Sequence, residues 1–155
     1  ANRHPAAYHE ALAGLAAAER MRNAYLIAGL AAGAAEACCG LGEWAQAEHY
    51  ATYALSQEEP FFRPSACTAL GLVRHAAGRT DEALSYLGEA LDGARQIADR
   101  YTEAYVQRVI AVVLYSAGRD EAAGSALDAA LHIFTELGLA FEVNRTHDLI
   151  RRNQP

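Results

Sequence analysis

The sequence has no lysine and only three cysteines. All 13 of its basic residues are arginine, and with 19 acidic residues the formal net charge is −6. Proteins that bind nucleic acids usually carry a basic surface, so we expect no direct contact between this region and DNA or RNA. The cysteines, Cys38, Cys39 and Cys67, are odd in number and lack CxxC spacing. They are therefore predicted to be reduced, buried thiols in a cytoplasmic protein.

Long apolar runs and targeting signals are also missing. The most apolar stretch is interrupted by Arg22, Glu36 and Glu43. We therefore expect no membrane span, which requires about 18–20 apolar residues. The N-terminal region lacks the basic segment and apolar core of a signal peptide. Met21 is the only methionine, so Ala1 is not an initiator. Either a methionine was removed or the chain is a fragment of a longer protein, and we favour the fragment.

The sequence does contain an internal repeat. Hydrophobic residues make up 52% and charged residues 21% of its 155 residues, which is typical of one globular domain. Turn glycines recur at nearly equal intervals, at Gly42, Gly78 and Gly118. An alanine stands at the fifth position after each glycine, and an Ala-Leu pair begins at the twelfth. These residues are Ala47, Ala83 and Ala123, then Ala54-Leu55, Ala90-Leu91 and Ala130-Leu131.

Each repeat is predicted to be a pair of antiparallel helices. Glycine accepts the left-handed backbone conformation at a helix end, so it suits the turn between the two helices. The residue seven before each glycine is small (Ala35, Gly71 and Ala111), which lets paired helices approach closely. One pair cannot bury its apolar face alone, so successive pairs must stack.

This pattern predicts an all-α fold in a single domain, 1–155. A half-repeat at 1–20 has Ala11, Leu15 and Ala18 in register with the later repeats. Repeats are expected at about 22–57, 64–98 and 103–137, followed by a C-terminal capping helix at 140–152. The predicted helices span 6–19, 22–40, 44–57, 64–77, 81–98, 103–117, 120–137 and 140–152. Pro64 suits a first helical turn, and Thr80 and Asp120 are predicted N-caps.

The small residue, the Gly-x-x turn and the alanine positions resemble the tetratricopeptide repeat. The periods are longer than the roughly 34 residues of the common repeat. In this respect, and in the stretch from Ala117 to Arg152, the chain is similar to the repeat domains of MalT-type and LuxR-type bacterial regulators. The resemblance covers nearly the whole chain. It implies a right-handed superhelical stack of about eight helices. It also implies a protein-binding role in transcription regulation, with DNA-binding and ATPase domains lying elsewhere in the parent protein.

In tetratricopeptide solenoids the first helix of each pair lines a concave groove, which implies that residues at fixed distances before each turn glycine face that groove. The predicted partner-binding residues are Glu36, Thr68, Leu72, His75, Tyr105, Arg108, Val112, Tyr115 and Arg145. Aromatic and basic side chains suit a peptide ligand, and a solvated face without a ligand is the alternative. Burying arginine without a carboxylate is unfavourable, so Arg108 is expected to meet a ligand or solvent.

Other partner classes and chemistries receive less support. Some chaperone-binding tetratricopeptide domains clamp a carboxylate with lysine and asparagine, and that partner class is not expected here. The corresponding slots hold Ala32, Glu36, Ala69, Tyr105 and Val109. Cys39 and His75 occupy equivalent slots, so they could form a nucleophile–base pair or two metal ligands. No spacing supplies an orienting carboxylate or an oxyanion hole, which favours a structural contact.

The sequence therefore predicts a binding or regulatory module and not an enzyme. No glycine-rich nucleotide loop, HExxH or GxSxG motif is present, and we expect no catalytic residue, cofactor or metal. The leading hypothesis is a protein or peptide partner for a regulator in the cytoplasm. One alternative is a sensor that binds a small molecule or peptide in the groove, and another is self-association as a homodimer.

Overall fold

The computed structural model of the chain describes residues 4–153. This part of the chain consists of eight α-helices, with no strand among the described residues. The helices are α1 His4–Arg20, α2 Ala24–Leu41, α3 Trp44–Leu55, α4 Arg63–Ala76, α5 Thr80–Gln96, α6 Arg100–Ser116, α7 Asp120–Glu136 and α8 Ala140–Asn153. The predicted all-α fold is confirmed, and every helix begins and ends close to its predicted position.

The turns follow from the glycines. Gly42, Gly78, Gly118 and Gly138 have φ angles of 78°, 73°, 69° and 69°. This left-handed conformation is unfavourable for residues with a Cβ atom, so glycine is the residue that best ends the preceding helix there. Each glycine reverses the chain into the next helix, as the repeat predicts.

Two helix caps differ from the prediction. Thr80 and Asp120 are the first helical residues of α5 and α7, and the N-cap positions belong to Arg79 and Arg119, which make no side-chain capping bond. Both helices thus begin one residue earlier than a cap at Thr80 or Asp120 implies. In α7, Asp120 and Glu121 lie in the first turn, where their negative charge complements the helix dipole. Asp99 does cap α6, because its carboxylate accepts the Thr102 N–H at 3.0 Å. This cap starts α6 before its predicted first residue.

Alanine and glycine set the distance between paired helices. Ala47, Ala83 and Ala123 are fully buried, which confirms the predicted register. At Gly71 a Cβ atom would lie 2.7 Å from the Cγ atom of Leu87, so only glycine permits this approach of α4 to α5. The core is thus built from small residues at the crossings and larger apolar side chains between the pairs.

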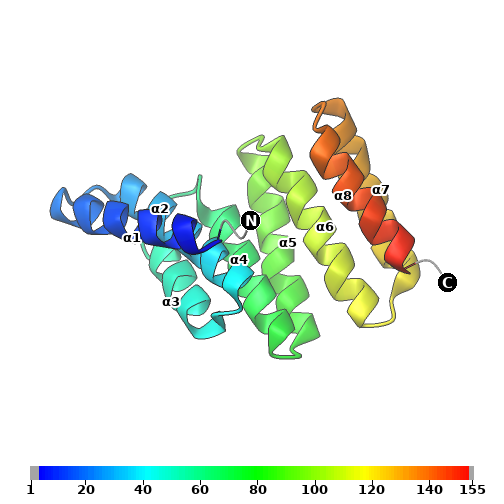
Figure 1. Cartoon of the computed structure of the whole chain (residues 1–155), viewed down its shortest axis with the longest axis horizontal. Coiled ribbons are helices and arrows are strands. Elements are labelled where there is room, and N and C mark those ends of the chain that lie inside the picture. Colours follow the sequence, from blue (N-terminus) through cyan, green and yellow to red (C-terminus); the bar gives the residue numbers. More distant parts are fainter. Residues whose placement is uncertain (1–3, 154–155) are drawn as a thin grey trace.

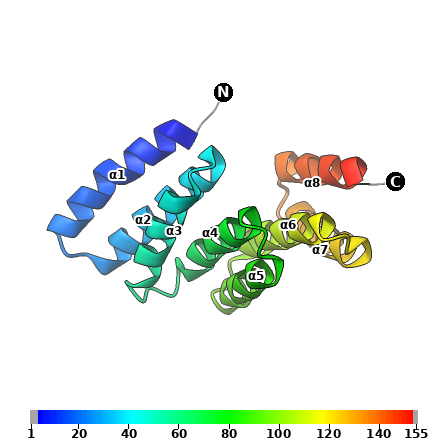
Figure 2. The ribbon, with the colours of Figure 1, turned by 90° about the horizontal axis from the view of Figure 1, so that it is seen from below.

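The helix pairs stack in a row to form a solenoid. Each helix packs against its neighbours in sequence, and α2 also packs against α4 and α4 against α6. Figure 1 shows the stack along its length, and Figure 2 shows α1 and α8 at the two ends of an arc. The side of α8 that faces away from this stack carries the exposed residues Asn144, His147 and Arg151. This polar face suits the predicted capping helix.

The expectation that no stretch of the chain is apolar enough for a membrane span does not hold for α2. By length and composition, α2 is the one helix of residues 4–153 that is apolar enough to cross a membrane. Glu36 lies within it, but one carboxylate does not outweigh the surrounding apolar residues. In the structure 44% of this helix is buried, and it packs against α1, α3 and α4. A core helix can pass the same compositional test.

Candidate ligand-binding groove

The even-numbered helices form a concave face with three adjoining hollows, which we call the groove. Their volumes are about 410, 200 and 420 Å³ from the α2 end to the α8 end. Tyr105 lines all three hollows, and Leu72 and Arg145 line the second and third. The hollows are therefore parts of one continuous surface that runs across α2, α4, α6 and α8.

The structure brings together most of the residues that the repeat register selects. Glu36, Leu72, Tyr105, Val112 and Arg145 all line the groove. They come from four different helices that are far apart in sequence. They meet because equivalent positions of stacked repeats lie on the same face of the solenoid.

Glu36 lies at the α2 end of the groove. Its side chain is accessible from the groove but surrounded by protein on several sides, and it lines two of the hollows. Burial raises the pKa of the Glu36 carboxyl, and a hydrogen bond with Ser65 partly opposes this rise. A carboxylate that has lost part of its hydration gains from a cationic or hydrogen-bond-donating ligand.

Tyr105 is half-buried at the centre of the groove. Burial raises the pKa of its hydroxyl to about 12, and the nearby Glu36 carboxylate adds to the rise. The phenol is therefore neutral at physiological pH. It can present an aromatic face and one O–H group to a ligand.

Arg108 is not free to meet a ligand, and this corrects the prediction made for it. Its guanidinium is buried and donates to the Glu142 carboxylate at 2.5 Å. It also lies 5.1 Å from the centre of the Phe134 ring and 3.5 Å from the Thr146 hydroxyl. Glu142 in α8 is the carboxylate partner that makes burial of this arginine favourable. Arg108 therefore fixes α8 to α6.

Three other residues that were predicted to contact a partner are also placed differently from the prediction. Thr68 is buried, and its hydroxyl donates to the Pro64 carbonyl at 2.8 Å, so it offers a ligand no free polar group. Tyr115 packs against the apolar cluster between α6 and α7. His75 does not line any of the three hollows. His75 and Tyr115 each stand three positions before a turn glycine, and Cys39, at the same position of the first repeat, does line the second hollow.

The Cys39 thiol does not pair with His75. It donates to the Ala69 carbonyl, with the sulfur 3.8 Å from the oxygen. Burial raises the pKa of Cys39 to about 12, and the Glu36 carboxylate adds to the rise. A nucleophilic or metal-binding cysteine needs a lowered pKa, so this thiol is suited to neither task. Among the described residues, no group of three or more histidine, cysteine and acidic side chains is placed to hold a metal ion.

The α8 end of the groove is basic. Arg145 and Arg152 line the third hollow and form no ion pair within residues 4–153. The one acidic residue beside them, Asp148, is already paired with Arg151. The groove therefore runs from a carboxylate of raised pKa at one end to two guanidinium groups that form no ion pair among the described residues at the other.

Sequence reasoning missed several groove residues, of which three have large side chains. Tyr101, Trp44 and Leu149 line hollows in the structure. Tyr101 lies one turn before Tyr105 on the same helix, so extending the register toward the start of α6 identifies it. Trp44 begins α3, a helix that the register assigns to the convex side, and no sequence signal indicates its exposure to the groove.

Comparison with known families agrees with this geometry. Residues 64–136, which span α4 to α7 and are just under half of the chain, match the model of a family described as Tetratricopeptide repeat. No curated protein matches the sequence. Residues 64–136 are thus similar to the tetratricopeptide repeat, and the stacked helices α4 to α7 agree with that similarity.

Proposed function

We propose that the chain is a protein-interaction and regulatory module that binds a peptide segment of a partner in its groove. The observation that carries this proposal is the pair of arginines, Arg145 and Arg152, in a hollow that also contains apolar side chains. Neither arginine forms an ion pair within the described residues 4–153. Two guanidinium groups that share one hollow repel each other, so such a surface gains free energy when a carboxylate reaches it.

The composition of the third hollow indicates what kind of segment fits. Leu72, Val112 and Leu149 offer apolar contacts beside Arg145 and Arg152. A peptide in which an acidic residue stands next to aliphatic residues would pair with the arginines and also contact the apolar side chains of this hollow. The hollows join into one surface instead of enclosing a small cavity, which favours an extended peptide over a small molecule.

The parent protein is, in our proposal, a bacterial transcription regulator that acts in the cytoplasm. Three free thiols and the resemblance of residues 117–152 to MalT-type and LuxR-type regulators support this origin. The DNA-binding domain would lie elsewhere in that protein. The reading frame of the full gene tests this part: an adjoining helix-turn-helix or nucleotide-binding domain is expected, and a parent without either would contradict it.

Groove binding is tested with selected peptides. Short linear peptides are selected from a random library on the purified chain, and their dissociation constants are measured for wild type and for Arg145→Ala combined with Arg152→Ala. We expect enrichment of acidic residues and at least tenfold weaker binding, which is about 1.4 kcal/mol. Arg20→Ala combined with Arg22→Ala, two exposed arginines far from the groove, is the matched control. Equal affinities for all three proteins would rule out the basic end of the groove.

A further inference from the structure

Each repeat carries an exposed aromatic residue at the same position. Tyr25, Phe61 and Tyr101 precede Gly42, Gly78 and Gly118 by the same distance along the chain. Phe141 follows Tyr101 by the interval that separates Gly78 from Gly118. The exposed fractions of these four residues, which we call the aromatic edge, are 48%, 51%, 47% and 75% in chain order. Large aromatic side chains normally contribute to burial, so their regular exposure in every repeat needs an explanation.

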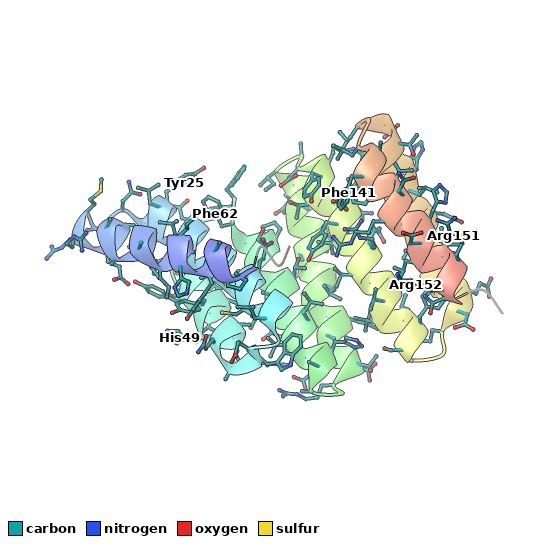
Figure 3. The ribbon with its side chains drawn as sticks, in the orientation of Figure 1. Tyr25, His49, Phe62, Phe141, Arg151 and Arg152 are labelled. Atoms are coloured by element: carbon teal, nitrogen blue, oxygen red, sulfur yellow. The ribbon has the colours of Figure 1, made fainter. Side chains whose placement is uncertain are left out.

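The fold places these residues along one long edge of the solenoid. Tyr25, Tyr101 and Phe141 are the second residues of α2, α6 and α8, and Phe61 lies just before α4. Helices alternate in direction, so the even-numbered helices all begin along the same edge of the stack. In Figure 1, α6 and α8 begin at the top, and α2 begins toward the left end of the molecule. Figure 3 shows Tyr25 and Phe141 in the upper half of the molecule.

Other exposed apolar side chains gather on this edge. Most of the large hydrophobic residues that are exposed in the described chain belong to the helix ends and turns on this side. They are Met21, Tyr25, Leu26, Phe61, Tyr101, Leu137 and Phe141. Scattered exposed residues need no explanation, but such a concentration marks an interaction surface.

The α2 end of the edge is pre-organised. The Tyr25 ring centre lies 4.9 Å from that of Phe62 and 6.4 Å from that of Phe61, in tilted or edge-to-face geometry. A Cβ atom on Gly29 would lie 2.7 Å from the Phe62 ring, so glycine makes room for Phe62 to rest on α2. Rings held in place before binding lose little conformational entropy when a ligand covers them.

Charge selects the class of ligand. A hollow of about 290 Å³ beside Phe61 is lined by Leu55, Glu58, Glu59, Pro60 and Arg63. Arg63 is paired with Glu89 at 2.9 Å, whereas Glu58 and Glu59 form no ion pair within residues 4–153. The charges along the edge are uneven. Segment 56–63 carries Glu58 and Glu59 against Arg63, whereas segment 19–25 carries Glu19 against Arg20 and Arg22. Near Tyr101 and Phe141, the carboxylates of Glu103, Glu136 and Glu142 are paired with arginines. The Glu58 and Glu59 carboxylates beside Phe61 therefore attract cations and repel anionic lipids at this point of the edge.

We propose that the aromatic edge binds an extended, basic segment of a partner protein. One arginine or lysine of that segment enters the Glu58–Glu59 hollow and stacks on the neighbouring rings through a cation–π contact. Proline or aliphatic residues lie against Tyr101 and Phe141, as extended segments do on aromatic surfaces. Packed helices lie about 8–10 Å apart and an extended chain spans about 3.3 Å per residue. Contacts on two helices that pack directly together therefore correspond to about three residues of the segment.

This site differs in chemistry from the groove. The α8 end of the groove is basic and suits an acidic segment, whereas the edge suits a basic one. Tyr101 also lines the first hollow of the groove, whereas Tyr25, Phe61 and Phe141 line none of the three hollows. Substitutions of these three residues therefore test the edge separately from the groove.

The test uses a fluorescein-labelled peptide of seven proline–arginine repeats, and a matched peptide with glutamate in place of arginine. Binding to the full chain is measured by fluorescence anisotropy at physiological ionic strength. We expect saturable binding of the arginine peptide, at least tenfold tighter than that of the glutamate peptide. Tyr25→Ala with Phe61→Ala, and separately Glu58→Gln with Glu59→Gln, should each weaken binding at least tenfold. Phe141→Ala alone should weaken it about threefold.

Two controls separate the edge from general charge and from the groove. Glu121→Gln with Asp128→Asn removes the same net charge from exposed positions of α7 and should leave binding unchanged. Arg145→Ala with Arg152→Ala should also leave it unchanged. Circular dichroism melts verify that each variant is folded, and Phe141→Ala and the Glu58–Glu59 variant decide the result if the double aromatic variant unfolds.

Several outcomes would overturn the proposal. One is the absence of saturable binding, and another is equal weakening by the α7 control. Loss of binding only in the Arg145–Arg152 variant would place the peptide in the groove. A dimer in sedimentation experiments that Phe61→Ala dissociates would make a second copy the occupant. Binding to vesicles of phosphatidylcholine and phosphatidylserine, lost in the same edge variants, would make the occupant a membrane.

Discussion

The guanidinium of Arg108 in α6 and the carboxylate of Glu142 in α8 form an ion pair of 2.5 Å, with both side chains nearly buried. The pair joins two helices that are separated in the chain by the whole of α7. Since α8 contributes Arg145 and Arg152 to the groove, this pair also sets the position of the proposed ligand-binding arginines.

Breaking this pair should therefore be strongly destabilising. Glu142→Gln leaves Arg108 buried without a full counter-charge, and we expect a loss of about 3 kcal/mol in the free energy of unfolding, measured with urea. Replacing both residues by apolar ones, Arg108→Met with Glu142→Leu, should recover most of that loss. The control Asp148→Asn removes an exposed pair and should change stability by less than about 0.5 kcal/mol. A Glu142→Gln protein as stable as this control would contradict the assigned role.

Close packing at the helix crossings predicts the effect of enlarging an alanine. Ala83 is fully buried between α5 and its neighbours, so Ala83→Leu should lower the free energy of unfolding by about 1–3 kcal/mol through overpacking. Ala122→Leu, at an exposed position of α7, should change it by less than about 0.5 kcal/mol. Thermal or urea unfolding of the two variants compares them directly, and equal stabilities would mean that the crossing is looser than the structure indicates.

The raised pKa of Glu36 predicts a pH-dependent gain in stability on substitution. Burial raises this pKa in the folded state, so the ionised carboxylate opposes folding at pH values above it. Glu36→Gln should therefore raise the melting temperature at pH 7. The difference should shrink as the pH falls through the folded-state pKa toward the ordinary value of about 4.3, because wild-type Glu36 is then protonated in both states. Glu121→Gln, which lies outside the groove, serves as the control. A Glu36→Gln difference that stays constant at all pH values would exclude this explanation.

The three thiols should react slowly in the folded chain and completely in the unfolded one. Burial raises the pKa of Cys39 to about 12 and that of Cys67 to about 11, and it also raises the pKa of Cys38. The thiolate is the reactive form, so alkylation at pH 8 should be more than about tenfold slower than for a free cysteine. Under denaturing, non-reducing conditions mass spectrometry should find three labels. Fewer than three would reveal a disulfide.

The repeat register could be predicted because it depends on local and repeated physics. Gly42, Gly78 and Gly118 end their helices through their own backbone freedom. Alanine at fixed distances from these glycines lies at the crossings because the helical period of about 3.6 residues fixes its side. The same period places Glu36, Tyr105 and Arg145 on the groove face.

Whether the polar group of a groove residue is free to bind a ligand could not be predicted in the same way. Thr68 and Arg108 occupy groove positions in the register, but Thr68 is bonded to the carbonyl of Pro64 and Arg108 to Glu142. These partners depend on rotamers and on the angle at which α8 lies across α6. A periodic pattern carries no information on either.

The sequence by itself thus determined the helices, their turns and the face of each helix that turns inward, since each depends on backbone conformation and on spacing along one chain segment. The tertiary structure decided which polar side chains are satisfied inside the protein and which remain free. It turned Arg108 into a structural ion pair, left Arg145 unpaired in the groove, and exposed Tyr25, Phe61, Tyr101 and Phe141 along one edge. The physical reason is that hydrogen bonds and ion pairs require distances of about 3 Å between atoms of different helices. Only the stacking of those helices sets such distances.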